Sequence, residues 1–150
     1  MCEDILNPVE RPAGVQRVTA ALAERGHPHT PVMLSDAART AQQAADALGV
    51  ALGQIAKSII FRRKNHPSGD DVAVLVITSG DLRVDEKKVQ AIVCAEGGKL
   101  GRADADFVKA RTGFSIGGVS PLAHATLPVT LIDEQPVSYT HLTLPTNREV

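Results

Sequence analysis

The sequence predicts a single mixed α/β (α+β) domain in which short helices flank one mixed β-sheet. The length of 150 residues fits one domain, since domains usually hold about 100–200 residues. Some segments repeat apolar residues at helical spacing, whereas others are short apolar runs typical of strands. Because the two kinds of segment are interleaved and the strands do not alternate strictly, we expect one sheet covered by helices.

Two helices are predicted in the first third of the chain. The first spans residues 12–22, and Gly26 provides its stop. The second begins at Thr40, which forms a capping box with Gln43, and it ends at Gly49. The residues expected to be buried on these helices are Val15, Val18, Leu22, Ala41, Ala44, Ala45 and Leu48.

The strands are predicted from short apolar runs. Residues 55–62 and 72–78 form two such runs, and the Pro- and Gly-containing stretch 63–71 between them is typical of a hairpin loop. Shorter strands are predicted over 32–34 and 129–132.

Two more helices are predicted between these strands. Asp85 and Asp104 are good N-cap residues, Val84 and Val89 are spaced for a hydrophobic staple, and Gly113 closes the last helix. The residues expected on the buried sides are Val89, Ile92, Val93, Phe107 and Val108.

Composition excludes several classes of protein. Sixteen Lys and Arg residues oppose 17 Asp and Glu residues, so the chain is no bulk polycation that holds nucleic acid by charge alone. No apolar run approaches the roughly 20 residues of a membrane helix. Cys2 and Cys94 are too few for a disulfide scaffold, which favours a reducing cytoplasm. None of the five histidines has zinc-site spacing, so no metal is expected.

Lys57 is the most informative polar residue. Strand side chains alternate between faces, so Lys57 shares a face with Ile55, Ile59 and Phe61. A cation on an apolar face is costly unless it is paired or lines a wet pocket, and burial lowers its pKa in a way that suits catalysis. The structural alternative is an edge lysine that bends out to solvent.

The loop 117–121 is the second candidate feature. The adjacent glycines Gly117 and Gly118 let backbone N–H groups approach a carboxylate, a phosphate or a developing oxyanion. The alternative is a tight turn between strands, and no phosphate-binding Gly-Lys-Ser/Thr sequence follows the glycines.

The last fifteen residues differ in character from the rest. Residues 136–150 read PVSYTHLTLPTNREV and contain the chain's one tyrosine. They resemble the translation of a transposase adaptor used in sequencing-library preparation. We therefore expect a domain over residues 1–135 and a non-native tail over 136–150. We further expect this replacement to leave an apolar edge uncovered.

Four segments together resemble the YbaK/ProX (YbaK/EbsC) family of aminoacyl-tRNA deacylases, relatives of the editing domain of prolyl-tRNA synthetases. The motifs are TAQQAADALG at 40–49, QIAKSIIF at 54–61, TGFSIGGVSP at 112–121 and LID at 131–133. The resemblance implies a mixed α/β domain with a curved, barrel-like sheet. It also implies hydrolysis of the ester that joins a wrong, small amino acid to the 3′-terminal ribose of a tRNA, with no cofactor.

The resemblance assigns roles to particular residues. The family's essential lysine corresponds to Lys57. Its substrate-binding positions correspond to Thr40, Gly117, Gly118, Ser120, Pro121 and Asp133. Some relatives carry an aromatic residue where this chain has Thr40, so their amino-acid preference does not transfer. The implied partners are the acceptor end of an aminoacyl-tRNA and a prolyl-tRNA synthetase, without a membrane.

Two other functions remain open at this point. The same fold and pocket would serve a non-catalytic module that binds an aminoacyl end or a small ligand. A serine–lysine hydrolase would require Ser79 or Ser120 to reach Lys57 through the fold.

Overall fold

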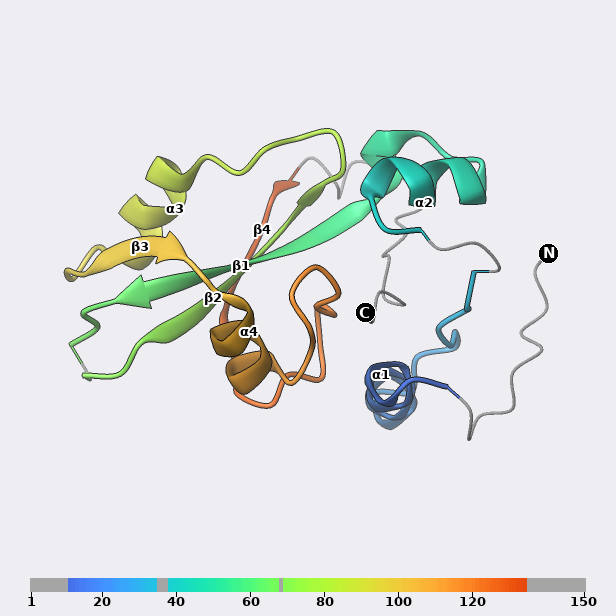
Figure 1. The fold of residues 1–150 in the computed structure, drawn as a ribbon, viewed down its shortest axis with the longest axis horizontal. Helices are drawn as coiled ribbons and strands as arrows, with labels where there is room; N and C mark the ends of the chain where they lie inside the picture. Colours follow the sequence, from blue (N-terminus) through green and yellow to red (C-terminus); the bar gives the residue numbers. More distant parts are fainter. Residues whose placement is uncertain (1–10, 35–37, 68, 135–150) are drawn as a thin grey trace.

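The computed structural model describes residues 11–34, 38–67 and 69–134 (Figure 1). The predicted tail over 136–150 lies outside this part. The elements in chain order are α1 (Ala13–Glu24), α2 (Ala41–Leu48), a 3₁₀ helix η2 (Leu52–Gln54), β1 (Ala56–Lys64), β2 (Val72–Ser79), α3 (Glu86–Val93), β3 (Lys99–Arg102), α4 (Ala105–Thr112) and β4 (Val129–Ile132). The predicted mixed α/β class is confirmed.

The four strands form one open sheet in the order β3-β1-β2-β4. β1 pairs antiparallel with β2 over residues 56–63, but it pairs with β3 only over 61–64. β4 runs parallel to β2. The expected barrel-like closure is not confirmed, because β3 and β4 lie at opposite edges and do not pair.

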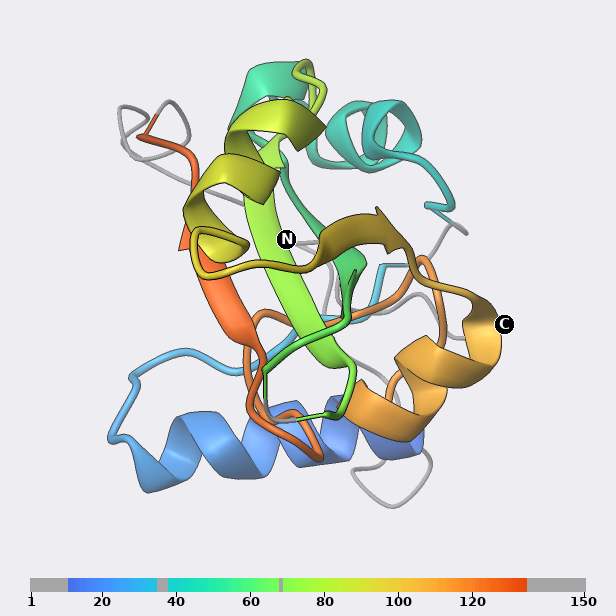
Figure 2. The same ribbon diagram turned by 90° about the vertical axis from the view of Figure 1, so that its left-hand side faces the viewer.

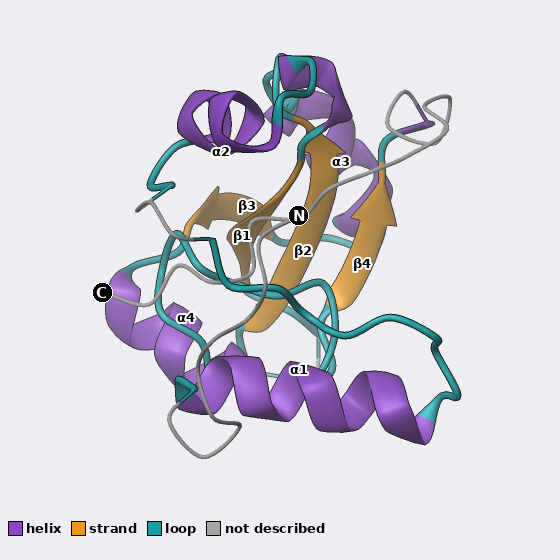
Figure 3. Ribbon diagram, turned by 90° about the vertical axis from the view of Figure 1, so that its right-hand side faces the viewer, coloured by secondary structure: helices purple, strands orange, loops and turns teal. Residues whose placement is uncertain are grey.

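The sheet is covered on both faces. α3 packs on one face, where Val89 and Val93 contact Phe61, Val74 and Val76. On the other face, α1, α4 and the segment that follows α4 form a second apolar cluster around Ile60. The buried members of that cluster are Val18, Val108, Phe114 and Val119. Figures 2 and 3 show α1 running crosswise to the strands beside α4.

Helix boundaries follow the predicted local signals. Thr40 and Gln43 form the expected capping box, and the Asp85 and Asp104 carboxylates accept bonds from backbone N–H groups of the first turns of α3 and α4. Gly49 and Gly113 end α2 and α4 in the left-handed conformation. These interactions lie within a few residues of each other, which explains why the sequence predicts them.

Other expectations are wrong. Residues 32–34 form no strand, since none of the described strands pairs with them. Leu48 and Ile92, expected to be buried, are 38% and 63% exposed. On α2 the buried residues Ala44 and Ala45 pack with Ala38 and Ile55, and on α3 the sheet is contacted by Val89 and Val93, so these helices turn Leu48 and Ile92 outward. The apolar side chains of Leu127, Val129 and Ile132, in and just before edge strand β4, are also exposed.

Candidate functional site

The position of Lys57 on β1 and a hydrogen bond to Leu82 set the orientation of its side chain. Its Cα pairs with that of Thr78 on β2, and its side chain shares the α3 face with Ile59 and Phe61. The side chain is half-buried, and its Nζ donates a hydrogen bond to the Leu82 carbonyl oxygen. Lys57 is therefore held in place at the apolar face rather than extended into solvent.

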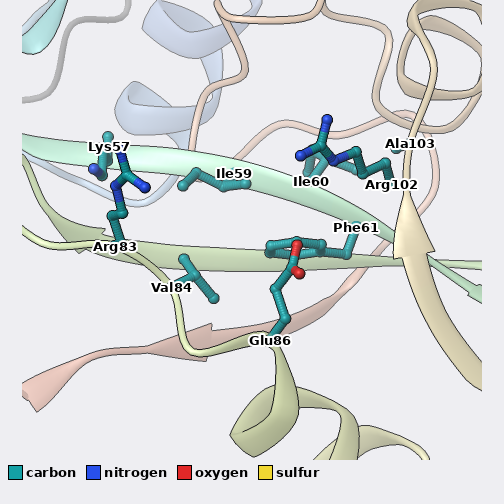
Figure 4. A pocket seen from close by; sticks show the side chains of 9 residues that line it. All are labelled: Lys57, Ile59, Ile60, Phe61, Arg83, Val84, Glu86, Arg102 and Ala103. Carbon is teal, nitrogen blue, oxygen red and sulfur yellow. The ribbon is translucent and has the colours of Figure 1, made fainter.

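A cavity of about 330 Å³ opens beside Lys57. Figure 4 shows Lys57 and Arg83 close together at one end and Arg102 at the other, with Ile59 between them. The complete lining is Lys57, Ile59, Ile60, Phe61, Arg83, Val84, Glu86, Arg102 and Ala103. The cavity thus combines an apolar wall with three cations and one carboxylate, a combination that suits an anionic ligand with an apolar part.

The surroundings of Lys57 change its acidity. Burial lowers the pKa of the ammonium, because a charged group loses hydration at an apolar wall. The Asp81 carboxylate raises this pKa, and the Arg83 guanidinium lowers it. A lysine with a lowered pKa in a cavity is a candidate functional group.

Asp133 lies in the same row of the sheet as Lys57. Its backbone N–H donates to the Ile77 carbonyl oxygen at 2.9 Å, just past the end of β4. The Thr78 hydroxyl lies 3.5 Å from Asp133 Oδ2. Lys57, Thr78 and Asp133 therefore follow one another across β1, β2 and the end of β4. Thr78 cannot be recognised from the sequence, because a threonine in the apolar strand 72–78 carries no distinguishing signal.

The structure does not bring the glycine loop into this cavity. The segment around Phe114 and Val119 packs on the opposite face of the sheet, where Gly117 lines a second cavity of about 240 Å³. The two cavities flank the same stretch of β1, since Ile59 and Ile60 line both. Lys57 and Gly117 thus lie on different sides of that stretch.

The backbone of the loop is already engaged in a turn. Gly117 has φ +83°, and the Gly118 N–H donates to the Ser115 carbonyl oxygen at 2.9 Å. Ser120 is fully buried, and its hydroxyl accepts from the Leu122 N–H at 3.3 Å. The Gly118 N–H is therefore used within the protein, which weakens the expected contribution of this group to an oxyanion site.

One side chain contacts this loop, and a second holds the residues on either side of it. His124 Nε2 lies 2.7 Å from the Ser120 carbonyl oxygen and must donate, because a carbonyl only accepts. Burial lowers the pKa of His124, while the Ser120 carbonyl raises it and Arg17 lowers it. Arg17 of α1 donates to the carbonyl oxygens of Thr112, Gly113 and Ala123.

The remaining predicted positions lie apart from both cavities. Thr40 is exposed at the start of α2, where its hydroxyl accepts from the Gln43 N–H at 3.1 Å. Pro121 is half-buried and lines neither cavity. Ser79 is buried and donates to the Gly53 carbonyl oxygen at 2.5 Å, so neither Ser79 nor Ser120 bonds to Lys57. The serine–lysine alternative therefore loses its geometric basis.

No side-chain cluster suited to a metal occurs within residues 11–34, 38–67 and 69–134, counting groups of three or more His, Cys, Asp and Glu. In the same described part, no helix is long and apolar enough to cross a membrane.

Comparisons with known proteins identify the relatives of this fold. The family profile described as "Aminoacyl-tRNA editing domain" matches residues 35–149. The uncharacterized protein YwhH of Bacillus subtilis (strain 168) is 37% identical over 94 residues, which are 63% of this chain and 55% of YwhH. The chain thus matches about half the length of that curated relative.

Solved structures agree with this relationship. The crystal structure of "a putative trans-editing enzyme for prolyl tRNA synthetase" has a TM-score of 0.74 and 37% identity, covering 85% of this chain and 76% of that one. A scaffold from work on computational epitope grafting gives 0.73 and 38% over the same shares. Hypothetical protein APE2540 gives 0.76 and 25%, covering 89% of this chain and 83% of the other.

Proposed function

Because this chain belongs to the family of aminoacyl-tRNA editing domains, we propose that it hydrolyses mischarged aminoacyl-tRNA in trans. In this reaction water attacks the ester carbonyl and the bond to the 3′-terminal ribose breaks. The products are the free amino acid and a tRNA with its terminal hydroxyl restored. An aminoacyl ester is already activated, so a positioned water suffices as the nucleophile.

The observation that carries this proposal is the place of Lys57. Its ammonium is held at the apolar wall of a 330 Å³ cavity by the Leu82 carbonyl. There it would bind the ester carbonyl and stabilise the negative charge that develops on that oxygen in the transition state. Such a charge is worth more at a partly dehydrated site than in water.

Substrate selection would follow from the size of the site. Because a cavity of about 330 Å³ exceeds the volume of any single amino-acid side chain, size selection would require that the terminal ribose fill part of it and leave room only for a small aminoacyl group. The crystal structure assigned to prolyl-tRNA synthetase editing is a relative of this chain, so tRNA mischarged by such a synthetase is the first substrate to test.

A deacylation time course tests the proposal. The protein is incubated with a panel of tRNAs that carry different small amino acids, beside Lys57→Ala and the matched control Lys64→Ala. Lys64 is an exposed lysine of the same strand outside the cavity. We expect release for one or two members of the panel, a loss of about 10²–10³-fold in kcat for Lys57→Ala, and no change for the control.

Two results would contradict this function. Release no faster than in buffer for every member of the panel would favour the non-catalytic binding module. Equal release by the wild type and Lys57→Ala would mean that another group carries the chemistry.

A further inference from the structure

We propose that Arg83 and Arg102 bind the phosphodiester backbone at the single-stranded 3′ end of the tRNA, so that the Lys57 cavity also anchors the nucleic acid. This inference rests on the proposed deacylase function and deepens it. It names the part of the substrate that the two arginines hold and separates their role from that of Lys57.

The two arginines mark the two ends of the cavity. Arg83 lies in the connection between β2 and α3, beside Lys57, whereas Arg102 is the last residue of β3 and its Cα pairs with that of Phe61 (Figure 4). Lys57 and Phe61 are four residues apart on β1, which corresponds to about 13 Å. Four stacked nucleotides at about 3.4 Å each have a similar length.

Among the described residues, no ion pair neutralises the charges of these arginines. In the described part of the chain, neither Arg83 nor Arg102 has a carboxylate within ion-pair distance. Arg62 shows the contrast, since its guanidinium lies 2.6 Å from Asp71 and 3.9 Å from Asp104. Both cavity arginines are exposed, so an incoming phosphate reaches them without a change in the fold.

The wall between the arginines suits the rest of a nucleotide. Ile59, Phe61 and Val84 form an apolar surface on which a base can pack, and Glu86 is the one carboxylate among the lining residues. Phosphate contacts position a nucleic acid without reading its sequence. The chain's net charge of −1 gives no general attraction for RNA, so the two guanidinium groups, which no described carboxylate pairs with, supply a local one.

A set of binding measurements with tRNA that carries no amino acid tests the inference independently of turnover. The probes are a fluorescently labelled tRNA transcript and the same transcript without its last four nucleotides, measured by anisotropy between 50 and 200 mM KCl. The proteins are the wild type, Arg102→Gln, Arg83→Gln and the control Lys99→Gln. Lys99 is an exposed cation on the same strand as Arg102 but outside the cavity.

We expect each cavity variant to bind the intact transcript about tenfold more weakly, which corresponds to about 1.4 kcal/mol. Each should also reduce the slope of log Kd against log salt by about 0.7, the value for one single-strand phosphate contact. The trimmed transcript should bind the wild type and both variants equally, and Lys99→Gln should match the wild type.

Three results would overturn the inference. The first is equal binding of intact and trimmed transcripts by the wild type. The second is an undiminished salt slope in both cavity variants. The third is an equal loss of binding affinity in Lys99→Gln, which would indicate diffuse electrostatic attraction.

In kinetic assays Arg102→Gln should raise KM with little change in kcat, whereas Lys57→Ala should lower kcat. Because these binding measurements use tRNA without an amino acid, they remain decisive even if no deacylation is found.

Discussion

Arg17 is predicted to be the main link between α1 and the segment that carries the glycine loop, and Arg17→Met tests this role. Its guanidinium donates to the carbonyl oxygens of Thr112 at 3.1 Å and Gly113 at 3.2 Å, and also to that of Ala123. It stacks on the Phe114 ring with 4.6 Å between the Cζ atom and the ring centroid. Methionine retains the apolar stem but removes all four polar or stacking contacts.

The expected loss follows from these contacts. A charge-assisted hydrogen bond contributes about 1.5–3 kcal/mol, but this site is half-buried, so about 1 kcal/mol for each bond is a suitable value. Stacking of the cation on the ring adds about 0.5–1 kcal/mol. Water reaching the freed carbonyls recovers part of this sum. We therefore expect Arg17→Met to lower the free energy of unfolding by about 3 kcal/mol.

Urea and thermal unfolding followed by circular dichroism measure this change. For a chain of this size, 3 kcal/mol corresponds to a fall in Tm of about 6–12 °C. Arg25→Met is the control, since Arg25 is exposed and its guanidinium donates to the Ala21 carbonyl oxygen of its own helix at 3.3 Å. The control should stay within about 0.5 kcal/mol of wild type. Arg17→Lys should restore less than half, because an ammonium cannot bridge three carbonyls and stack as well. Equal stability of Arg17→Met and Arg25→Met would refute the reasoning.

Two further predictions concern acidity and backbone conformation. If protonated Lys57 is required, kcat/KM should fall as pH rises through its lowered pKa, and the two neighbours of Lys57 should move this fall in opposite directions. Asp81→Asn should shift it to lower pH and Arg83→Gln to higher pH in a profile corrected for buffer hydrolysis, and shifts of one sign would contradict the assignment. Gly113→Ala would place a Cβ against the Arg17 guanidinium at a left-handed φ of +79°, so it should cost about 1–3 kcal/mol in urea unfolding. An unchanged midpoint would show that the Arg17 contact is not tight.

Local features of the fold are predictable from the sequence. The capping residues Thr40, Asp85 and Asp104 act on backbone groups two or three residues away, so their effect is legible in the chain itself. By contrast, β3 cannot be predicted from local sequence, because it depends on a distant segment. Its sequence KLGR has no apolar pattern, and it becomes a strand only because residues 61–64 of β1 supply hydrogen-bonding partners.

In the candidate site, too, some residues can be predicted from local sequence and others cannot. Lys57 is recognisable because a cation interrupts an apolar strand face, a signal confined to a few residues. Thr78, Arg83 and Arg102 carry no such signal, since each is an ordinary residue for a strand or loop. Pairing of β1 with β2 and β3 places Thr78 and Arg102 beside the Lys57 row and cavity, and the connection from β2 to α3 brings Arg83 there.

Short-range patterns in the chain account for the helix ends, the two long strands and the membership of Lys57 in an apolar face. Each of these depends on interactions between residues close in the chain. Long-range packing places Asp133 in the row of Lys57 and the glycine loop on the other side of β1. That choice depends on β4 running parallel to β2 and on α1 and α4 covering one face. Contacts between distant segments arise from packing of the whole chain, so no local pattern encodes them.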